Sequence, residues 1–153
     1  MVIKRKENRM VEQDTIKLLR ECDAGIKMGV KSIDDIEKYV KSVEMKGLLQ
    51  TCKEDHKKLE KEIDALLAVY GDDGKSPNPI ATGMSWMKTS MKLGIHPSDK
   101  TVADLMTDGC NMGVKSLSGY LNQYKAASER SKDIAKRLIK IENDLGVSMR
   151  AYL

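Results

Sequence analysis

Phenylalanine is absent from this sequence of 153 residues, and aromatic side chains make up only 4% of it. Methionine and lysine are plentiful and runs of β-branched residues are few, a composition that favours helices over strands. Only three prolines occur, and all of them lie between Pro77 and Pro97, so the long segments on either side can be helical without interruption. The composition therefore predicts an all-α protein, long enough for one domain with a real core.

Long apolar runs are missing as well. The longest, over residues 65–70, is far too short to cross a bilayer, and the charged N-terminus has no apolar segment of the kind found in signal peptides. Cysteine is sparse: Cys22, Cys52 and Cys110 are odd in number and fall at apolar helix positions, which is typical of reduced core thiols in a reducing compartment. We therefore expect a cytoplasmic protein without a membrane-spanning segment.

The formal net charge of +4 is concentrated near the N-terminus. Lys4, Arg5, Lys6 and Arg9 are opposed there by Glu7, so the rest of the chain is close to neutral. Affinity for phosphate needs several cations on one surface, so this cluster is weak support for nucleic-acid binding. We expect residues 1–10 to form a basic, flexible tail that precedes a single domain over residues 11–153.

One pentapeptide, Met-Gly-Val-Lys-Ser, occurs twice, at residues 28–32 and again at residues 112–116. The flanking residues agree at the same spacing of 84: Gly25 with Gly109, and Ile33 with Leu117. Around both copies the apolar residues follow a seven-residue repeat, as they do on the inward stripe of a bundle helix. The agreement predicts a duplicated helical hairpin.

Four helices are expected from these patterns. The first covers residues 12–43 and ends before a break at Gly47, and the second covers residues 48–70. A third begins at Ser98 or Asp99 as N-cap, and a fourth runs from residue 131 to the C-terminus.

The connection between the two hairpins, residues 71–100, is about thirty residues long, whereas adjacent antiparallel helices need only a few. It is long enough to travel the full length of a bundle. Within it we expect a short amphipathic helix that carries Met84, Trp86, Met87 and Met91. This helix would cover the open side of the bundle or present an adaptable surface to a partner.

Two hairpins joined by one long crossover resemble the ferritin-like four-helix bundle, in particular its small uncharacterised bacterial members. The resemblance rests on helix number, repeat and crossover length over residues 12–153. It implies a homo-oligomer such as a dimer, because bundles of this kind commonly pair through helix faces. In the di-iron proteins of this type, two helices each supply a Glu and the other two each supply a Glu-x-x-His motif.

Those ligands are largely missing here. Segments 26–30 and 110–114 contain no glutamate, and no Glu-x-x-His motif occurs in the chain. His56 is the one polar residue on the inward stripe of its helix, and we interpret it as a buried, hydrogen-bonded imidazole. We therefore expect no di-iron centre and no cofactor. The alternative is an atypical iron or zinc site, with these candidate ligands: His56, Glu142, Cys52 and Glu54.

Paired glycines stand where the ligand glutamates are expected. Gly25 and Gly29 lie one helical turn apart, and so do Gly109 and Gly113. An interior glycine costs a helix about 1 kcal/mol relative to alanine, so four of them need a reason. One explanation is close packing of the first and third helices. The other is a pocket for a ligand between the helices.

These patterns lead to a main hypothesis and two alternatives. The main hypothesis is a non-enzymatic ferritin-like bundle with a structural or protein-interaction role. The first alternative is a metal-binding protein or metal-dependent oxidoreductase with its site around His56. The second is a protein that binds a small ligand between its hairpins.

Overall fold

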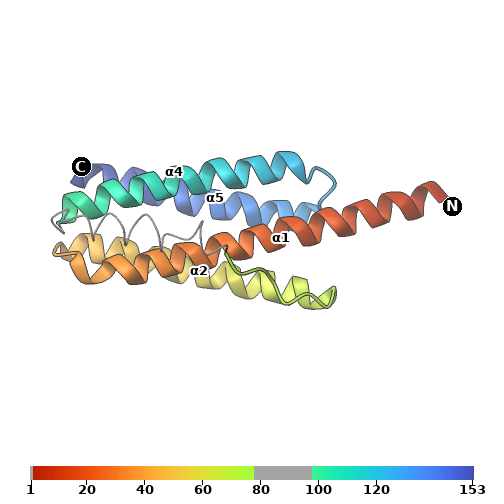
Figure 1. The fold of residues 1–153 in the computed structure, drawn as a ribbon, viewed down its shortest axis with the longest axis horizontal. Helices are drawn as coiled ribbons and strands as arrows, with labels where there is room; N and C mark the ends of the chain where they lie inside the picture. Colours follow the sequence, from red (N-terminus) through yellow and green to blue (C-terminus); the bar gives the residue numbers. More distant parts are fainter. Residues whose placement is uncertain (1, 78–97) are drawn as a thin grey trace.

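The computed structural model describes residues 2–77 and 98–153, and within these ranges the chain is helical, without strands. Its four long helices are α1 (Val2–Ile36), α2 (Val43–Val69), α4 (Asp99–Gln123) and α5 (Glu129–Met149). Short 3-10 helices follow α1 (η1, Glu37–Tyr39) and α5 (η2, Arg150–Tyr152). In Figure 1, α1 and α2 run antiparallel to each other, as do α4 and α5. The predictions of an all-α chain and of four helices are confirmed.

Two of the expected helix boundaries are wrong at the start of the chain. α1 begins at Val2 and not near residue 12, so residues 2–10 continue the helix as an exposed extension beyond the bundle (Figure 1). The turn to α2 lies at residues 40–42 and not at Gly47, which is inside α2.

Capping explains the position of that turn. The Ser42 side chain accepts a hydrogen bond from the Met45 amide at 3.1 Å, which caps α2. The carboxylate of Asp99 accepts from the amides of Lys41 and Ser42 at 2.7 and 3.0 Å, so the first residue of α4 holds the turn of the other hairpin.

The remaining boundaries agree more closely. Ser98 is the N-cap of α4, as predicted, and α5 begins at Glu129, two residues earlier than expected. α2 is followed by Gly71 and Gly74, which both have a positive φ and allow the chain to turn away from the helix. The crossover helix predicted to carry Met84, Trp86, Met87 and Met91 lies outside the described residues.

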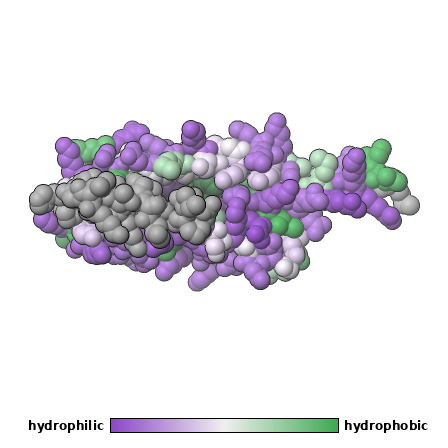
Figure 2. All heavy atoms as spheres, in the orientation of Figure 1, coloured by the Kyte–Doolittle hydropathy of each residue, from purple (hydrophilic) through white to green (hydrophobic). Residues whose placement is uncertain are grey.

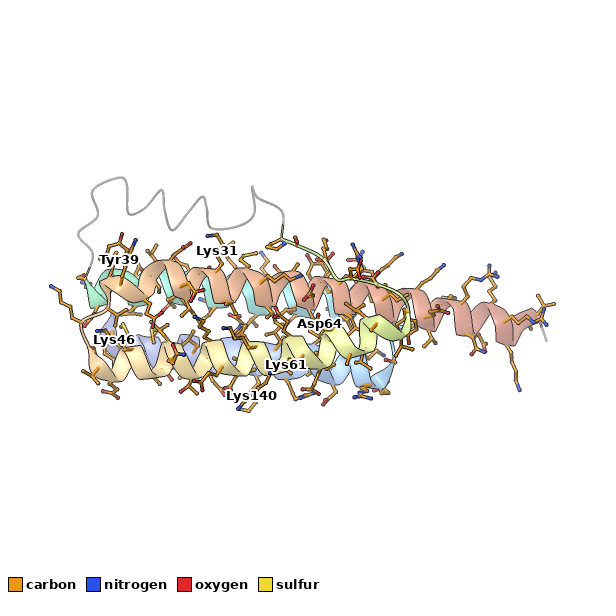
Figure 3. All side chains as sticks on the ribbon, turned by 90° about the horizontal axis from the view of Figure 1, so that it is seen from below. Lys31, Tyr39, Lys46, Lys61, Asp64 and Lys140 are labelled. Carbon is orange, nitrogen blue, oxygen red and sulfur yellow. The ribbon has the colours of Figure 1, made fainter. Side chains whose placement is uncertain are left out.

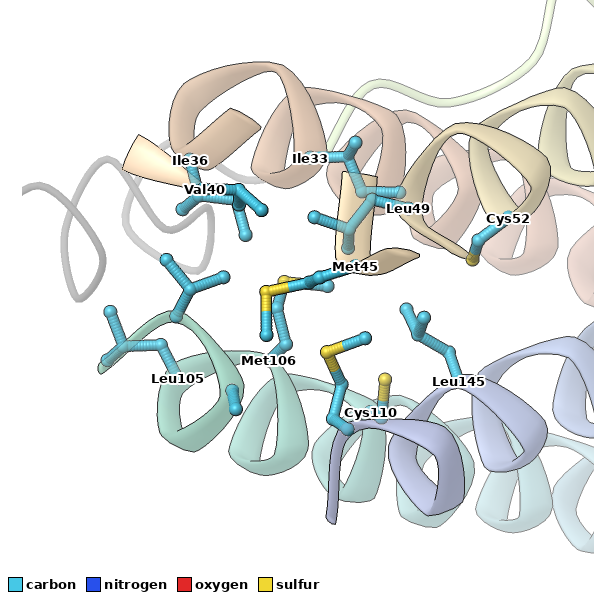
Figure 4. Close-up of a cluster of buried hydrophobic side chains, with 13 residues drawn as sticks. Ile33, Ile36, Val40, Met45, Leu49, Cys52, Leu105, Met106, Cys110 and Leu145 are labelled. Atoms are coloured by element: carbon cyan, nitrogen blue, oxygen red, sulfur yellow. The ribbon is translucent and has the colours of Figure 1, made fainter. Parts of the chain in front are cut away.

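The core consists of two apolar clusters along the bundle axis. The turn-side cluster, drawn in Figure 4, lies at the end with the α1–α2 turn and includes Ile33, Met45, Leu49, Met106 and Leu145. The second cluster lies toward the α4–α5 turn; its members include Leu18, Ile26, Leu59, Ile63 and Leu138. Each fully buried Leu or Ile contributes about 1.5–3 kcal/mol by leaving water, so these clusters are the main support of the fold.

The outer faces of the helices are charged. Lys61 on α2 and Lys140 on α5 are exposed, and Figure 3 shows the side chains along these faces. Most of the coloured surface in Figure 2 is hydrophilic. None of the helices in the described ranges is both long and apolar enough to span a membrane.

Candidate functional site

A buried ion pair lies between the two apolar clusters. His56 on α2 is only 1% exposed, and its Nε2 lies 2.8 Å from Oε1 of Glu142 on α5. The other ring nitrogen, Nδ1, lies 2.7 Å from the backbone carbonyl oxygen of Cys52, one turn earlier in α2. A carbonyl and a carboxylate are both acceptors, so both ring nitrogens of His56 donate. The geometry therefore holds the imidazole as a cation.

The electrostatics of the pair agree with this assignment. Burial lowers the pKa of His56, but hydrogen bonds to Cys52 and Glu142, together with the negative charge of Glu142, raise it to about 10. At neutral pH the imidazolium of His56 faces the carboxylate of Glu142. The sequence interpretation of His56 as a buried and hydrogen-bonded imidazole is confirmed, and Glu142 is its partner.

Two of the paired glycines lie directly against this ion pair. A Cβ atom at Gly29 would lie 2.9 Å from Nε2 of His56, closer than real Cβ atoms approach other atoms. A Cβ atom at Gly113 would lie 3.3 Å from Oε2 of Glu142. Gly29 on α1 and Gly113 on α4 therefore leave room for the imidazole and the carboxylate.

Gly25 has a different environment. A Cβ atom there would meet nothing within 4 Å among the described residues, so the backbone of another helix does not approach Gly25 closely. Gly109, its counterpart in the repeat, lines the same open space. That space is a cavity of about 310 Å³ beside the ion pair.

The two copies of the repeat form facing walls of this cavity. On α1 its lining includes Gly25, Met28, Gly29, Ser32 and Ile33; on α4 it includes Gly109, Met112, Gly113, Ser116 and Leu117. Every residue in the second set stands 84 positions after its counterpart in the first. The same side of both duplicated helices therefore faces the cavity, next to Cys52, His56 and Glu142.

One end of the cavity has a second polar group. Glu21 of α1 forms an ion pair with the side chain of Lys75, and both residues line the cavity with Tyr120. Burial and the neighbouring Glu21 raise the pKa of Tyr120 above its usual value, so its hydroxyl stays protonated at neutral pH. The charges at this end are therefore paired with each other.

Residues 72–75 are held against α1 by further polar contacts. The fully buried Asp23 accepts hydrogen bonds through Oδ2 from the Lys75 amide at 2.9 Å and from Lys27 Nζ at 2.8 Å. Arg20 binds Asp72 through both carboxylate oxygens, at 2.8 and 3.0 Å. These contacts fix the position of Lys75 at the cavity.

The residues proposed as metal ligands are only partly brought together. Cys52 Sγ lies 3.5 Å from His56 Nδ1, and Glu142 lies on the other side of the ring, but Glu54 is exposed on the outer face of α2. Both ring nitrogens of His56 are used in hydrogen bonds, so neither offers a lone pair to a metal. Within residues 2–77 and 98–153, no three His, Cys, Asp or Glu side chains are arranged to hold a metal ion. This donor set does not fit an iron or zinc site.

The three cysteines are free and buried, as the sequence predicted. Burial and the neighbouring Glu21 and Asp23 raise the pKa of Cys22 to about 12. Burial and Glu142 also raise the pKa of Cys110, which lines the cavity. Both side chains are therefore neutral thiols at physiological pH.

The repeat at a spacing of 84 does not reveal the relation between α2 and α5. Their inward-facing positions match at a spacing of 86, not 84, as the following pairs show: Leu49 and Ala135, Cys52 and Leu138, His56 and Glu142, Leu59 and Leu145, Ile63 and Met149. His56 and Glu142 therefore occupy equivalent positions in the two hairpins. An alignment of the second helices that allowed a shift of two residues would have identified Glu142 as the partner.

Comparisons of this chain with protein-family models, with curated proteins and with solved structures gave no match.

Proposed function

We propose that this chain is a non-enzymatic, ferritin-like four-helix bundle that binds a small, mainly apolar molecule in its interior. The observation that carries the proposal is the cavity of about 310 Å³ whose two walls come from the two copies of the repeat. Pockets for small molecules typically measure about 300–1,000 Å³ and have an apolar lining with a few polar groups. The cavity beside His56 and Glu142 lies at the lower end of this range.

The environment of the glycines supports a pocket over close packing of helices. The nearest atoms to a Cβ at Gly29 or Gly113 belong to the side chains of His56 and Glu142, not to the backbone of a facing helix. Gly25 faces open space. Four interior glycines weaken α1 and α4 by about 1 kcal/mol each relative to alanine. A binding site explains why glycine occurs at these positions despite the loss of helix stability.

The ferritin-like topology is part of the proposal. Two antiparallel hairpins, a repeat that relates their first helices, and the separation of Gly71 from Asp99 along the chain support it. In this proposal the His56–Glu142 ion pair occupies the interior position at which di-iron relatives hold metal. Assembly into a homo-oligomer such as a dimer, and a cytoplasmic location, belong to the same proposal and rest on the resemblance and composition alone.

A pair of leucine substitutions tests the binding site. Gly25→Leu places a side chain in the cavity, whereas Gly119→Leu, also on a helix and with nothing described within 4 Å of its Cβ, does not line the cavity. We expect toluene to shift the methyl NMR signals of Met28, Met106 and Met112, which line the cavity, in the wild type and in Gly119→Leu. The same signals should not move in Gly25→Leu. Absence of these shifts in the wild type, or equal shifts in both variants, would overturn the proposal.

A further inference from the structure

Of the two side chains in the His56–Glu142 ion pair, only the carboxylate can still form hydrogen bonds with a ligand in the cavity. His56 donates from both ring nitrogens to protein acceptors, so it has no donor left for a ligand. Glu142 accepts a hydrogen bond from His56 through Oε1, and the neutral thiol of Cys110 lies in the same cavity lining. A carboxylate has about four acceptor sites, and the Glu142 side chain is 14% exposed where it lines the cavity. Within the ion pair, the group available to a ligand is therefore an acceptor, and the neutral hydroxyls of Ser32, Ser116 and Tyr120 complete the polar lining.

The charged groups at the other end of the cavity are bound to each other. The ammonium group of Lys75 binds Glu21, and the charge of Glu21 also raises the pKa of Tyr120 in the same lining. The cation of Lys75 is therefore compensated, so this end provides no unpaired positive charge for an anionic ligand. A ligand carboxylate would lose its hydration in a space where both lining cations, His56 and Lys75, are already bound to carboxylates, which is unfavourable.

The cavity is long in the direction of the helices. Its lining on α1 extends from Glu21 to Ile33, a distance of roughly 18 Å at the helical rise of 1.5 Å per residue. A volume of about 310 Å³ spread over this length favours a narrow molecule over a wide planar one. Apolar and small residues make up most of the lining, with methionine, leucine and isoleucine among them, so the body of the ligand is apolar.

From this geometry we infer that the cavity selects an elongated apolar molecule with a single hydrogen-bond donor, a hydroxyl or an amino group, which is bound by Glu142. The corresponding carboxylate is rejected. This inference rests on the proposed function, because it assigns a ligand class to the same cavity.

Three molecules of equal chain length test the inference: 1-octanol, 1-octylamine and octanoate, titrated at pH 7 and monitored through the methionine methyl signals of the cavity. For the wild type we expect the alcohol and the amine each to bind at least about tenfold more tightly than octanoate. Tighter binding of the amine than of the alcohol would identify a charged donor, and the reverse order a neutral hydroxyl; both orders support the inference.

Two variants locate the selectivity. Glu142→Gln keeps the size of the side chain but removes its charge and adds a donor, so the preference over octanoate should fall by about tenfold. Asp144→Asn, which changes an exposed carboxylate of the same helix that does not line the cavity, should leave the preference unchanged. If octanoate binds the wild type as tightly as 1-octanol does, the inference is wrong. This result does not depend on whether Glu142→Gln folds. Binding of toluene without this selectivity would leave the proposed function intact, whereas binding of neither toluene nor the C8 series would overturn both.

Discussion

The first helices of the two hairpins, α1 and α4, face the cavity with the same residues at four of five repeated positions; only Ile33 and Leu117 differ. The second helices, α2 and α5, keep a common register but differ at the polar position where they meet, with His56 in one and Glu142 in the other. The similar faces of α1 and α4 line a cavity that both hairpins share. The difference between α2 and α5 places the cation of His56 opposite the anion of Glu142.

Charge explains why α2 and α5 differ at the position of His56 and Glu142. Two carboxylates at the positions of His56 and Glu142 would repel each other in a partly desolvated interior, and two imidazolium groups would do the same. One His and one Glu satisfy each other instead, with the 2.8 Å hydrogen bond between Nε2 and Oε1. Gly29 on α1 and Gly113 on α4 have no side chain, which leaves the space that the imidazole of His56 and the carboxylate of Glu142 fill.

The largest effect is expected when the pair loses one member. His56→Leu leaves the carboxylate of Glu142 without its cation, and removal of one partner of a buried ion pair typically costs about 3–5 kcal/mol. Because the Glu142 side chain is 14% exposed and can be partly solvated, we expect a loss at the lower end of this range, about 3 kcal/mol in the free energy of unfolding. Urea denaturation measures this loss.

The double variant is the control for this prediction. When Glu142→Leu is added to His56→Leu, both polar groups are gone, and most of the lost stability should return. If the double variant is as unstable as the sum of the two single variants, His56 and Glu142 do not act as a pair.

A smaller effect separates two glycines of the same helix. Gly25→Ala adds a methyl group in open space and should stabilise the protein by about 0.5–1 kcal/mol through helix propensity. Gly29→Ala places its Cβ 2.9 Å from Nε2 of His56, and overpacking of this kind typically costs about 1–3 kcal/mol. Thermal and urea denaturation of both variants measure the difference. Equal effects at the two positions would show that the ion pair does not need a glycine on α1.

The most gradual effect, spread over two pH units, is a dependence of stability on pH. The pKa of His56 is raised from 6.5 in the unfolded chain to about 10 in the folded chain, so its contribution is complete below pH 6.5 and is lost as the pH rises toward 10. The free energy of unfolding should therefore fall between pH 6.5 and 8.5, by at most about 1.4 kcal/mol per pH unit.

This pH range isolates the imidazole. Burial also raises the thiol pKa values of Cys22 and Cys110 above 9.0, so these residues add a loss of the same sign only at higher pH. The variant His56→Leu/Glu142→Leu lacks the imidazole and should show a flatter profile between pH 6.5 and 8.5. An equal slope in the wild type and in this variant would contradict the raised pKa of His56.

Much of the fold could be read from local patterns. The inward stripes of the helices, the N-cap at Ser98 and the repeat at residues 28–32 and 112–116 are short-range features, and the structure places all of them on helices. The start of α1 and the α1–α2 turn were misplaced. The amides of Lys41 and Ser42 are bound by Asp99 of the other hairpin, a contact that no local pattern reveals.

The candidate site was predicted only in parts. His56 and the four glycines were identified because each breaks the expected pattern of its helix, and Glu142 was named only as a possible metal ligand. Their common role depends on the two-residue shift between α2 and α5, which brings Glu142 opposite His56. Lys75 and Tyr120 could not be assigned to the cavity from the sequence, since Asp23 and Glu21 of α1 hold Lys75 there.

The sequence by itself determined the four long helices of residues 2–77 and 98–153, with their apolar inward faces, and the equivalence of residues 25–33 and 109–117. Periodicity and identity are properties of the chain order. Only the tertiary structure decided that these segments face a cavity and that His56 is a cation bound to Glu142. The physical reason is that the pKa and the exposure of a side chain depend on atoms that packing brings from other helices.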